Sequence, residues 1–340
     1  MTSKLFALAR PCFVTVLFLL AAIGQSSVSA GIMLTSQGVA AGFGLSTFAD
    51  GFPVRNMGAI GDIGPLGIGF TNSGGVLVSD VYGDVRHFAS SMDGQSALSV
   101  PPSQNYGFFS ALGMANDGSS IYLATHVGNQ VVQINGDGTF NRTVVSGINI
   151  ARDIVVNSSN GHLFVSSQVG IWDVDPISNT KSLVLGGSTD GLSIHGNTLY
   201  AARGFNGTNF NSIQGFDIGS WSSVFDSGVI FGVDGLAVGS GSLAGKIYGN
   251  TNNGQLWEVS LSNPALKTLI ADGGSRGDLI RVDPNSNSLL FAQSDSVMRL
   301  TAPIDGGFGS NTVPEPSSIA ILGLMGLITF LRGRKKNCEG

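Results

Sequence analysis

The sequence predicts an all-β protein that folds as a six-bladed β-propeller, on the grounds of its composition, an internal repeat and the pattern of its short strands. The chain has 340 residues, of which 50 are Gly. Between residues 31 and 313 there are 20 acidic residues, and all are Asp except Glu258. Glu favours helices, whereas Asp favours turns because its short side chain can bond nearby backbone amides. We therefore expect many short strands, tight turns and little helix.

A short motif, in which a small or acidic residue precedes an apolar anchor, recurs six times. The anchors are Leu66, Leu112, Ile154, Leu192, Leu236 and Leu279. Their spacings are 46, 42, 38, 44 and 43 residues. A period of this size is typical of propeller blades.

Each anchor is followed by a turn and then by two further strand-like runs, several with the alternation of a half-buried strand. The second strands are expected over residues 76–78, 121–124, 162–165, 198–201, 246–248 and 288–291. The third strands are expected over residues 85–88, 131–134, 171–174, 213–216, 256–259 and 297–300. A β-sandwich or an open β-solenoid also consists of short strands, but a sandwich gives no reason for six evenly spaced anchors.

The sixth blade lacks a fourth strand of its own. Residues 143–147 and 267–273 are fourth strands of earlier blades, but nothing similar follows Leu300. Residues 45–51 resemble these fourth strands and have no first three strands before them. We expect this N-terminal segment to complete blade six, which would close the ring and leave no unpaired edge there.

The repeats resemble those of NHL and gluconolactonase-like (SMP-30) six-bladed propellers over about 260 residues, with the blade rhythm carrying the likeness. The propeller is expected to span residues 31–308. Fold resemblance alone does not define a function.

The N-terminal residues 1–30 are expected to form a helical signal peptide. Lys4 and Arg10 precede an apolar stretch over residues 12–23, and Val28-Ser29-Ala30 supplies the small residues of a cleavage site. Both cysteines, Cys12 and Cys338, lie in terminal segments that we expect to be lost. The mature protein would then contain no disulfide.

The C-terminal residues carry a second targeting signal. A linker over residues 309–318 is followed by a hydrophobic helix and basic tail over residues 319–340. The apolar run, residues 319–331, is shorter than the roughly 20 residues that a stable membrane span needs. The residues of the signal are Pro314, Glu315 and Pro316, and then the basic, membrane-stop residues Arg332, Arg334, Lys335 and Lys336.

This tail resembles a PEP-CTERM sorting signal. The resemblance implies recognition by an exosortase-type processing enzyme, transient anchoring by the C-terminal helix, and then release to the cell surface or the extracellular space. The alternative is an ordinary single-pass C-terminal anchor.

The charge of the predicted body excludes one class of partner. Residues 31–313 contain 11 basic and 20 acidic residues, so their net charge is −9. Nucleic acid is not expected to bind such a surface.

Four aspartates stand one or two positions before an anchor and are candidate metal ligands. They are Asp153, Asp190, Asp234 and Asp278. Equivalent positions on successive blades would bring these carboxylates to one mouth of the central channel, where oxygen ligands would suit Ca²⁺. In gluconolactonase-like enzymes an Asp-Gly-apolar triplet supplies a metal ligand, which Asp190 and Asp234 match, but the early Glu of that family is missing here. Capping of loops by the four carboxylates is the alternative.

The leading functional prediction is an exported, non-enzymatic propeller with a binding or structural role. A carbohydrate or protein would be its ligand, and the PEP-CTERM resemblance suggests a link to exopolysaccharide. The alternative is a metal-dependent, gluconolactonase-like hydrolase that uses the channel-mouth aspartates, with calcium as its metal.

Overall fold

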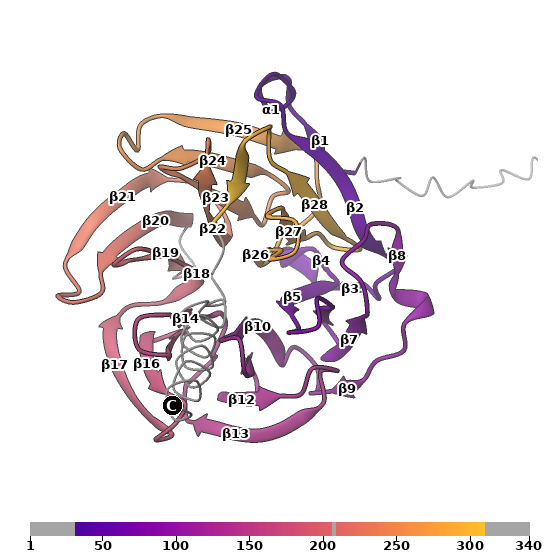
Figure 1. Cartoon of the computed structure of the whole chain (residues 1–340), viewed down its shortest axis with the longest axis vertical. Helices are drawn as coiled ribbons and strands as arrows, with labels where there is room; N and C mark the ends of the chain where they lie inside the picture. The colour runs from indigo at the N-terminus through magenta and orange to yellow at the C-terminus, as the bar shows by residue number, and fades with distance from the viewer. Residues whose placement is uncertain (1–30, 206–208, 310–340) are drawn as a thin grey trace, which may run out of the picture.

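The chain forms a six-bladed β-propeller, as the repeat predicts (Figure 1). The computed structural model describes residues 31–205 and 209–309. Six mainly antiparallel sheets surround a central axis, and the first strand of each sheet lies nearest to that axis. These inner strands are β5 (Pro65–Phe70), β10 (Ala111–Asn116), β14 (Ile154–Asn157), β18 (Thr189–His195), β22 (Val233–Gly241) and β26 (Ile280–Val282).

The remaining strands of each blade follow outwards in chain order, except in blade six. The second strands are β6 (Val76–Asp80), β11 (Ile121–Thr125), β15 (His162–Ser166), β19 (Thr198–Phe205), β23 (Lys246–Thr251) and β27 (Leu289–Ala292). The third strands are β7 (Asp84–Phe88), β12 (Gln130–Ile134), β16 (Gly170–Asp175), β20 (Asn209–Asp217), β24 (Leu256–Ser260) and β28 (Val297–Thr301). The fourth strands of blades one to five are β9 (Gln104–Asn105), β13 (Phe140–Ser146), β17 (Thr180–Gly186), β21 (Ser223–Val229) and β25 (Lys267–Asp272).

The fourth strand of blade six comes from the N-terminal side of the body, which confirms the predicted closure. Strand β2 (Gly44–Asp50) pairs antiparallel with β28, and Figure 1 shows the two side by side. Phe48 of β2 is fully buried and packs edge-on against Phe88 of blade one, with ring centroids 5.4 Å apart. One strand therefore completes blade six and also binds it to blade one.

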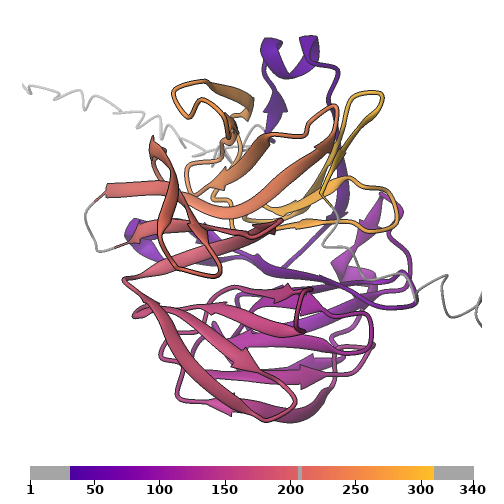
Figure 2. The same ribbon diagram turned by 60° about the vertical axis from the view of Figure 1, so that its left-hand side comes forward.

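Short elements extend this framework at its rim. Strand β1 (Met33–Leu34) pairs with β25, β8 (Gln95–Ser96) pairs parallel with β2, and β29 (Gly306–Phe308) pairs with the end of β22. The short helix α1 (Ser36–Ala40) stands out from the ring, as Figures 1 and 2 both show. Two 3₁₀ turns and one small hairpin complete the elements: η1 (Gly58–Ile60), η2 (Ala97–Ser99), β3 (Arg55–Asn56) and β4 (Asp62–Ile63).

Close approach of the inner strands explains why glycine stands at the start of several blades. A Cβ atom at Gly67 would lie 1.7 Å from the carbonyl oxygen of Leu112, in the next blade. A Cβ atom at Gly191 would lie 1.9 Å from the carbonyl oxygen of Asp234. Because these distances leave no room for a side chain, part of the repeated motif serves the packing of the ring.

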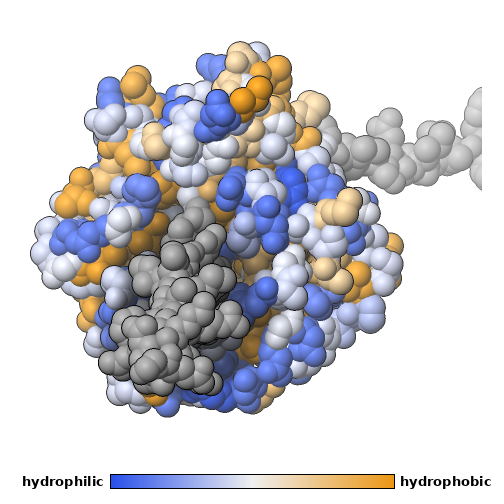
Figure 3. Space-filling view, viewed as in Figure 1, coloured by the Kyte–Doolittle hydropathy of each residue, from blue (hydrophilic) through white to orange (hydrophobic). Residues whose placement is uncertain are grey.

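The hydrophobic cores lie within and between neighbouring blades. Figure 3 shows that hydrophobic residues on the visible face are divided by hydrophilic ones. Exposed apolar side chains such as Met92 and Leu98 are normal on a protein surface when they are scattered.

The two predicted targeting segments lie outside the described residues. The signal helix over residues 1–30, the Pro314-Glu315-Pro316 segment and the hydrophobic helix over residues 319–331 stay predictions. Within residues 31–205 and 209–309, no helix has the length and hydropathy required to cross a membrane.

We expect Phe48→Ala to lower the free energy of unfolding by about 3–5 kcal/mol, because it empties a fully buried aromatic site in the closing strand. Urea denaturation of the full chain measures this change. Val224→Ala is the control: Val224 lies on the outer strand β21 and is 57% exposed, so its loss should cost less than about 0.5 kcal/mol. Equal effects of the two substitutions would contradict the closing role of β2.

Candidate functional site

A cavity of about 220 Å³ lies at one mouth of the central channel, and we call it the channel-mouth cavity. Three of the four predicted aspartates line it, whereas Asp153 does not. Its lining residues are Ile60, Phe109, Leu112, His126, Arg152, Asp190, Asp234, Asn252, Arg276 and Asp278. They come from the starts of the inner strands and from the loops around them, so the ring brings together residues that are far apart in sequence.

Local irregularity in two inner strands places two of these carboxylates. The pairing of β18 with β19 shifts between Thr189 and Leu192, and the pairing of β22 with β23 shifts between Val233 and Leu236. Asp190 and Asp234 lie within these β-bulges. A bulge re-aims the side chains of a strand, and here it accounts for two carboxylates that face the mouth of the channel.

Asp153 has a different role, although it occupies an equivalent place in the repeat. The pairing of β14 with β15 is regular from Ile154 onwards. The fully buried Asp153 carboxylate forms an ion pair with Arg281 of β26 and accepts hydrogen bonds from the backbone N–H groups of Ile154 and Leu192, each at 2.7 Å. This is the capping role that the sequence left open, combined with an ion pair across the channel.

Two of the channel-mouth carboxylates each lie close to an arginine. Asp190 Oδ2 lies 3.9 Å from Arg152 Nη1. Asp234 Oδ2 lies 3.8 Å from Arg276 Nη2. Within the described residues, three carboxyl groups therefore face two guanidinium groups, and the cluster is net negative only while all three carboxyl groups are ionised.

Burial and repulsion between the carboxylates raise the pKa values of two aspartates in this cluster. Burial raises the pKa of Asp234 well above its ordinary value, and the nearby carboxylates of Asp190 and Asp278 raise it further, against the effect of Arg276. The pKa of Asp278 rises to about 7, mainly through burial. The pKa of His126 is lowered, first by burial and then by Arg152, so its imidazole is neutral at pH 7.

Several buried polar atoms in this cavity have no hydrogen-bond partner among the described residues. They are Asp234 Oδ1, Asn252 Oδ1, His126 Nδ1 and Arg276 Nε. Leaving such an atom unpaired costs about 1–3 kcal/mol. A cluster of unpaired polar atoms within one cavity indicates a site for water or a polar ligand.

The residues present do not fit the calcium ion that the resemblance to gluconolactonase-like enzymes implies. The oxygen donors are of the right kind. However, the guanidinium groups of Arg152 and Arg276 already supply positive charge beside Asp190 and Asp234. In the described part of the chain, no group of three or more His, Cys, Asp or Glu side chains is arranged to hold a metal ion.

Sequence reasoning missed four residues of this site, and a positional signal could have found them. His126 and Asn252 each follow the second strand of a blade directly, after β11 and β23. Arg152 and Arg276 each stand one or two positions before an aspartate at the start of a blade. Aligning the six repeats by blade position would have shown that these places face the same mouth as the aspartates.

The protein is therefore a six-bladed propeller with an acid–base cluster, the three aspartates and two arginines of the channel-mouth cavity, at one end of its channel. No protein-family model and no curated protein matches the sequence. Solved structures do match. A gluconolactonase from Xanthomonas campestris aligns with a TM-score of 0.58 at 14% identity, over 80% of this chain and 95% of that one. A second protein, described as a gluconolactonase candidate, aligns with a TM-score of 0.58 at 15% identity, over 78% of this chain and 94% of that one.

A third similar structure is a candidate oxidoreductase (glucose dehydrogenase) from Thermus thermophilus, with a TM-score of 0.51 at 15% identity, over 76% of this chain and 100% of that one. At such low identity these likenesses establish the fold alone. They nevertheless contradict the leading prediction of a non-enzymatic binding or structural role, because the similar propellers are described as enzymes. Raised carboxyl pKa values such as those at the channel mouth are common at catalytic sites.

We expect Arg281→Met to lower the free energy of unfolding by about 3–5 kcal/mol, because it leaves the buried Asp153 carboxylate without its partner. Urea denaturation of the full chain measures the loss. The double variant Arg281→Met/Asp153→Asn should recover part of it, since the remaining group is uncharged. A loss below about 1 kcal/mol for Arg281→Met alone would show that the pair is dispensable.

We expect the stability of the protein to fall as the pH rises from about 4 to about 7. The folded-state pKa of Asp278 is about 7 and that of Asp234 is also raised, so the folded chain binds more protons than the unfolded chain in this range. Asp278→Asn should flatten this decline, whereas Asp305→Asn, which removes an exposed carboxyl group, should not. Urea denaturation at several pH values tests this, and a parallel decline in all three proteins would refute the assignment.

Proposed function

We propose that the protein is a hydrolase that opens a lactone or a similar small ester in the channel-mouth cavity. The observation that supports this most strongly is the pair Asp234 and Asp278 in one cavity, where burial and neighbouring carboxylates raise the pKa of Asp234 well above its ordinary value and that of Asp278 to about 7. Two carboxyl groups held in different protonation states can serve as acid and base. The likeness to gluconolactonase structures favours a lactone as the substrate.

In the proposed reaction Asp278 acts as the general base. Its carboxylate removes a proton from a water molecule, and the water oxygen forms a bond to the carbonyl carbon of the lactone. The guanidinium of Arg276 stabilises the negative charge that develops on the carbonyl oxygen. The bond between the carbonyl carbon and the ring oxygen then breaks, the protonated Asp234 gives its proton to the ring oxygen, and the product is a hydroxy acid.

His126 and Phe109 would shape the site around the substrate. The two rings meet edge to face, with centroids 5.0 Å apart. The lowered pKa keeps His126 neutral, so its unpaired Nδ1 can exchange a hydrogen bond with a substrate hydroxyl without adding charge. Ile60 and Leu112 add apolar surface beside the acid–base pair.

We expect the full chain to hydrolyse glucono-δ-lactone, with kcat/KM rising with pH and levelling above about pH 7 as Asp278 ionises. Asp278→Asn should lower kcat by about 10²–10⁴-fold, the usual contribution of a general base. A pH-stat assay corrected for spontaneous hydrolysis measures both effects.

Two controls accompany this assay. Asp305→Asn should leave kcat unchanged, because this exposed carboxyl group lies outside the cavity. A calcium chelator should also leave kcat unchanged, because the cluster does not fit a metal ion. A rate that Asp278→Asn does not alter would exclude the proposed base, and a rate that requires calcium would exclude the metal-independent reaction.

A further inference from the structure

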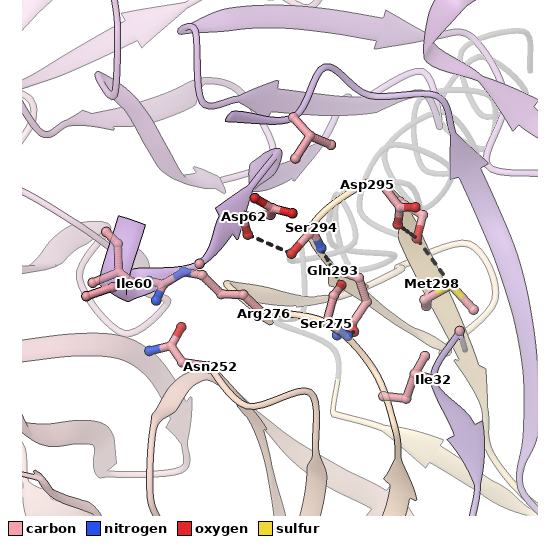
Figure 4. A pocket seen from close by; sticks show the side chains of 15 residues that line it. Ile32, Ile60, Asp62, Asn252, Ser275, Arg276, Gln293, Ser294, Asp295 and Met298 are labelled. Carbon is pink, nitrogen blue, oxygen red and sulfur yellow. Dashed lines mark hydrogen bonds between the residues drawn. The ribbon is translucent and has the colours of Figure 1, made fainter. Parts of the chain in front are cut away.

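A second and larger pocket adjoins the channel-mouth cavity between blades five and six, and we call it the outer pocket. It has a volume of about 640 Å³ and is lined by residues of the 275–276 and 293–298 segments together with the loop around η1 (Figure 4). Ile60, Asn252 and Arg276 line both spaces. A molecule bound at the acid–base pair could therefore extend directly into the outer pocket.

Hydrogen bonds hold the polar wall of the outer pocket in one shape. The Ser294 hydroxyl donates to the backbone oxygen of Asp62 at 2.6 Å, and the Ser294 N–H donates to the Ser275 hydroxyl at 2.8 Å. The Ser275 N–H donates to Gln293 Oε1 at 2.9 Å. Figure 4 shows Asp62, Ser294, Gln293 and Ser275 next to one another. A wall that is already ordered lowers the entropic cost of binding.

The chemistry of the lining selects a neutral ligand rich in hydroxyl groups. The exposed carboxylates of Asp62 and Asp295 disfavour an anion. At the junction with the cavity, Asn252 Oδ1 is a buried acceptor and Arg276 Nε a buried donor, and neither has a partner among the described residues. A hydroxyl group can satisfy either atom, because it both donates and accepts a hydrogen bond.

Apolar side chains complete the lining. Ile32, Ile60 and Met298 offer surface to the C–H groups of a ligand. The volume of the pocket falls in the range usual for small-molecule sites, about 300–1,000 Å³. A pyranose ring combines hydroxyl groups with C–H faces and matches this mixture of acceptors, donors and apolar surface.

We propose that the outer pocket is a subsite for a neutral sugar unit, so that the preferred substrate is a lactone carrying a glycosyl substituent rather than a single-ring lactone. This inference rests on the proposed function for the reaction itself, but the binding of the sugar unit does not. The lactone ring would lie at Asp234 and Asp278, and the glycosyl unit would extend past Arg276 and Asn252.

Comparison of two lactones tests the proposal. We expect kcat/KM of the full chain for cellobiono-δ-lactone to exceed that for glucono-δ-lactone by about tenfold or more. Ala59→Trp fills the outer pocket from the exposed turn η1 and should abolish this preference while leaving glucono-δ-lactone hydrolysis within about twofold of the original. Ser296→Trp, at another residue that lines the outer pocket, should do the same. Ala244→Trp, in an exposed turn outside both spaces, should change neither rate.

A binding measurement separates this inference from the proposed reaction. Calorimetry with cellobiose on the Asp278→Asn protein should show binding that is lost when Ala59→Trp is added and kept when Ala244→Trp is added. If neither lactone is hydrolysed but this binding pattern is found, the proposed reaction fails and the subsite stands. Absence of cellobiose binding, or equal binding by the two tryptophan variants, overturns the subsite.

Discussion

The interior of the ring depends on one guanidinium group that reaches across the channel. Arg281 comes from blade six, donates from Nε to the carbonyl oxygen of Met114 in blade two at 2.9 Å, and pairs with Asp153 at the start of blade three. Asp153 in turn accepts the backbone N–H of Leu192 in blade four. Four blades thus meet at one buried ion pair. Such a pair is favourable only when further hydrogen bonds satisfy both partners, as they do here.

The channel has a cavity at each end of its inner strands, and Arg281 reaches across it. The channel-mouth cavity lies at the starts of the inner strands, whereas a second cavity of about 350 Å³ lies at their far ends, around Phe70 and Asn116. Arg281 lines the far cavity, and the backbone oxygens to which it donates belong to inner strands of the channel wall. The channel-mouth cavity and the far cavity therefore lie at opposite ends of the inner strands.

The fold could be predicted because its causes are local and repeated. The turn-rich composition, the anchors spaced by 38 to 46 residues and the strand-like residues 45–51 each follow from rules that act within one blade. The site could be predicted only in part, because its causes join distant residues. Asp153 and Asp190 look alike in sequence, but only Asp190 lies in a bulge, and only Asp153 has Arg281 as its partner, 128 positions away in the chain. No spacing rule could reveal that pairing.

The glycine of the Asp-Gly-apolar triplet is a second example of what the sequence alone could not decide. The triplet at Asp190 and Asp234 resembles a metal-ligand motif, but the absence of a side chain at Gly191 is explained fully by the carbonyl oxygen that lies against it. A packing requirement and a functional residue therefore share one motif. The motif alone cannot distinguish them, because both are consequences of the same convergence of inner strands on the axis.

The order of the aspartates around the ring explains why their protonation differs. Asp190, Asp234 and Asp278 stand at the starts of blades four, five and six, so Asp234 is the middle carboxyl group and has an acidic neighbour on each side. It is also almost completely buried, with 3% of its surface exposed. Burial and the two neighbouring carboxylates raise the pKa of Asp234 well above its ordinary value, while Asp278, with a pKa of about 7, can lose its proton near neutral pH. In the proposed reaction the acid and the base would thus differ by their position in the ring, although both are aspartates at the starts of neighbouring blades.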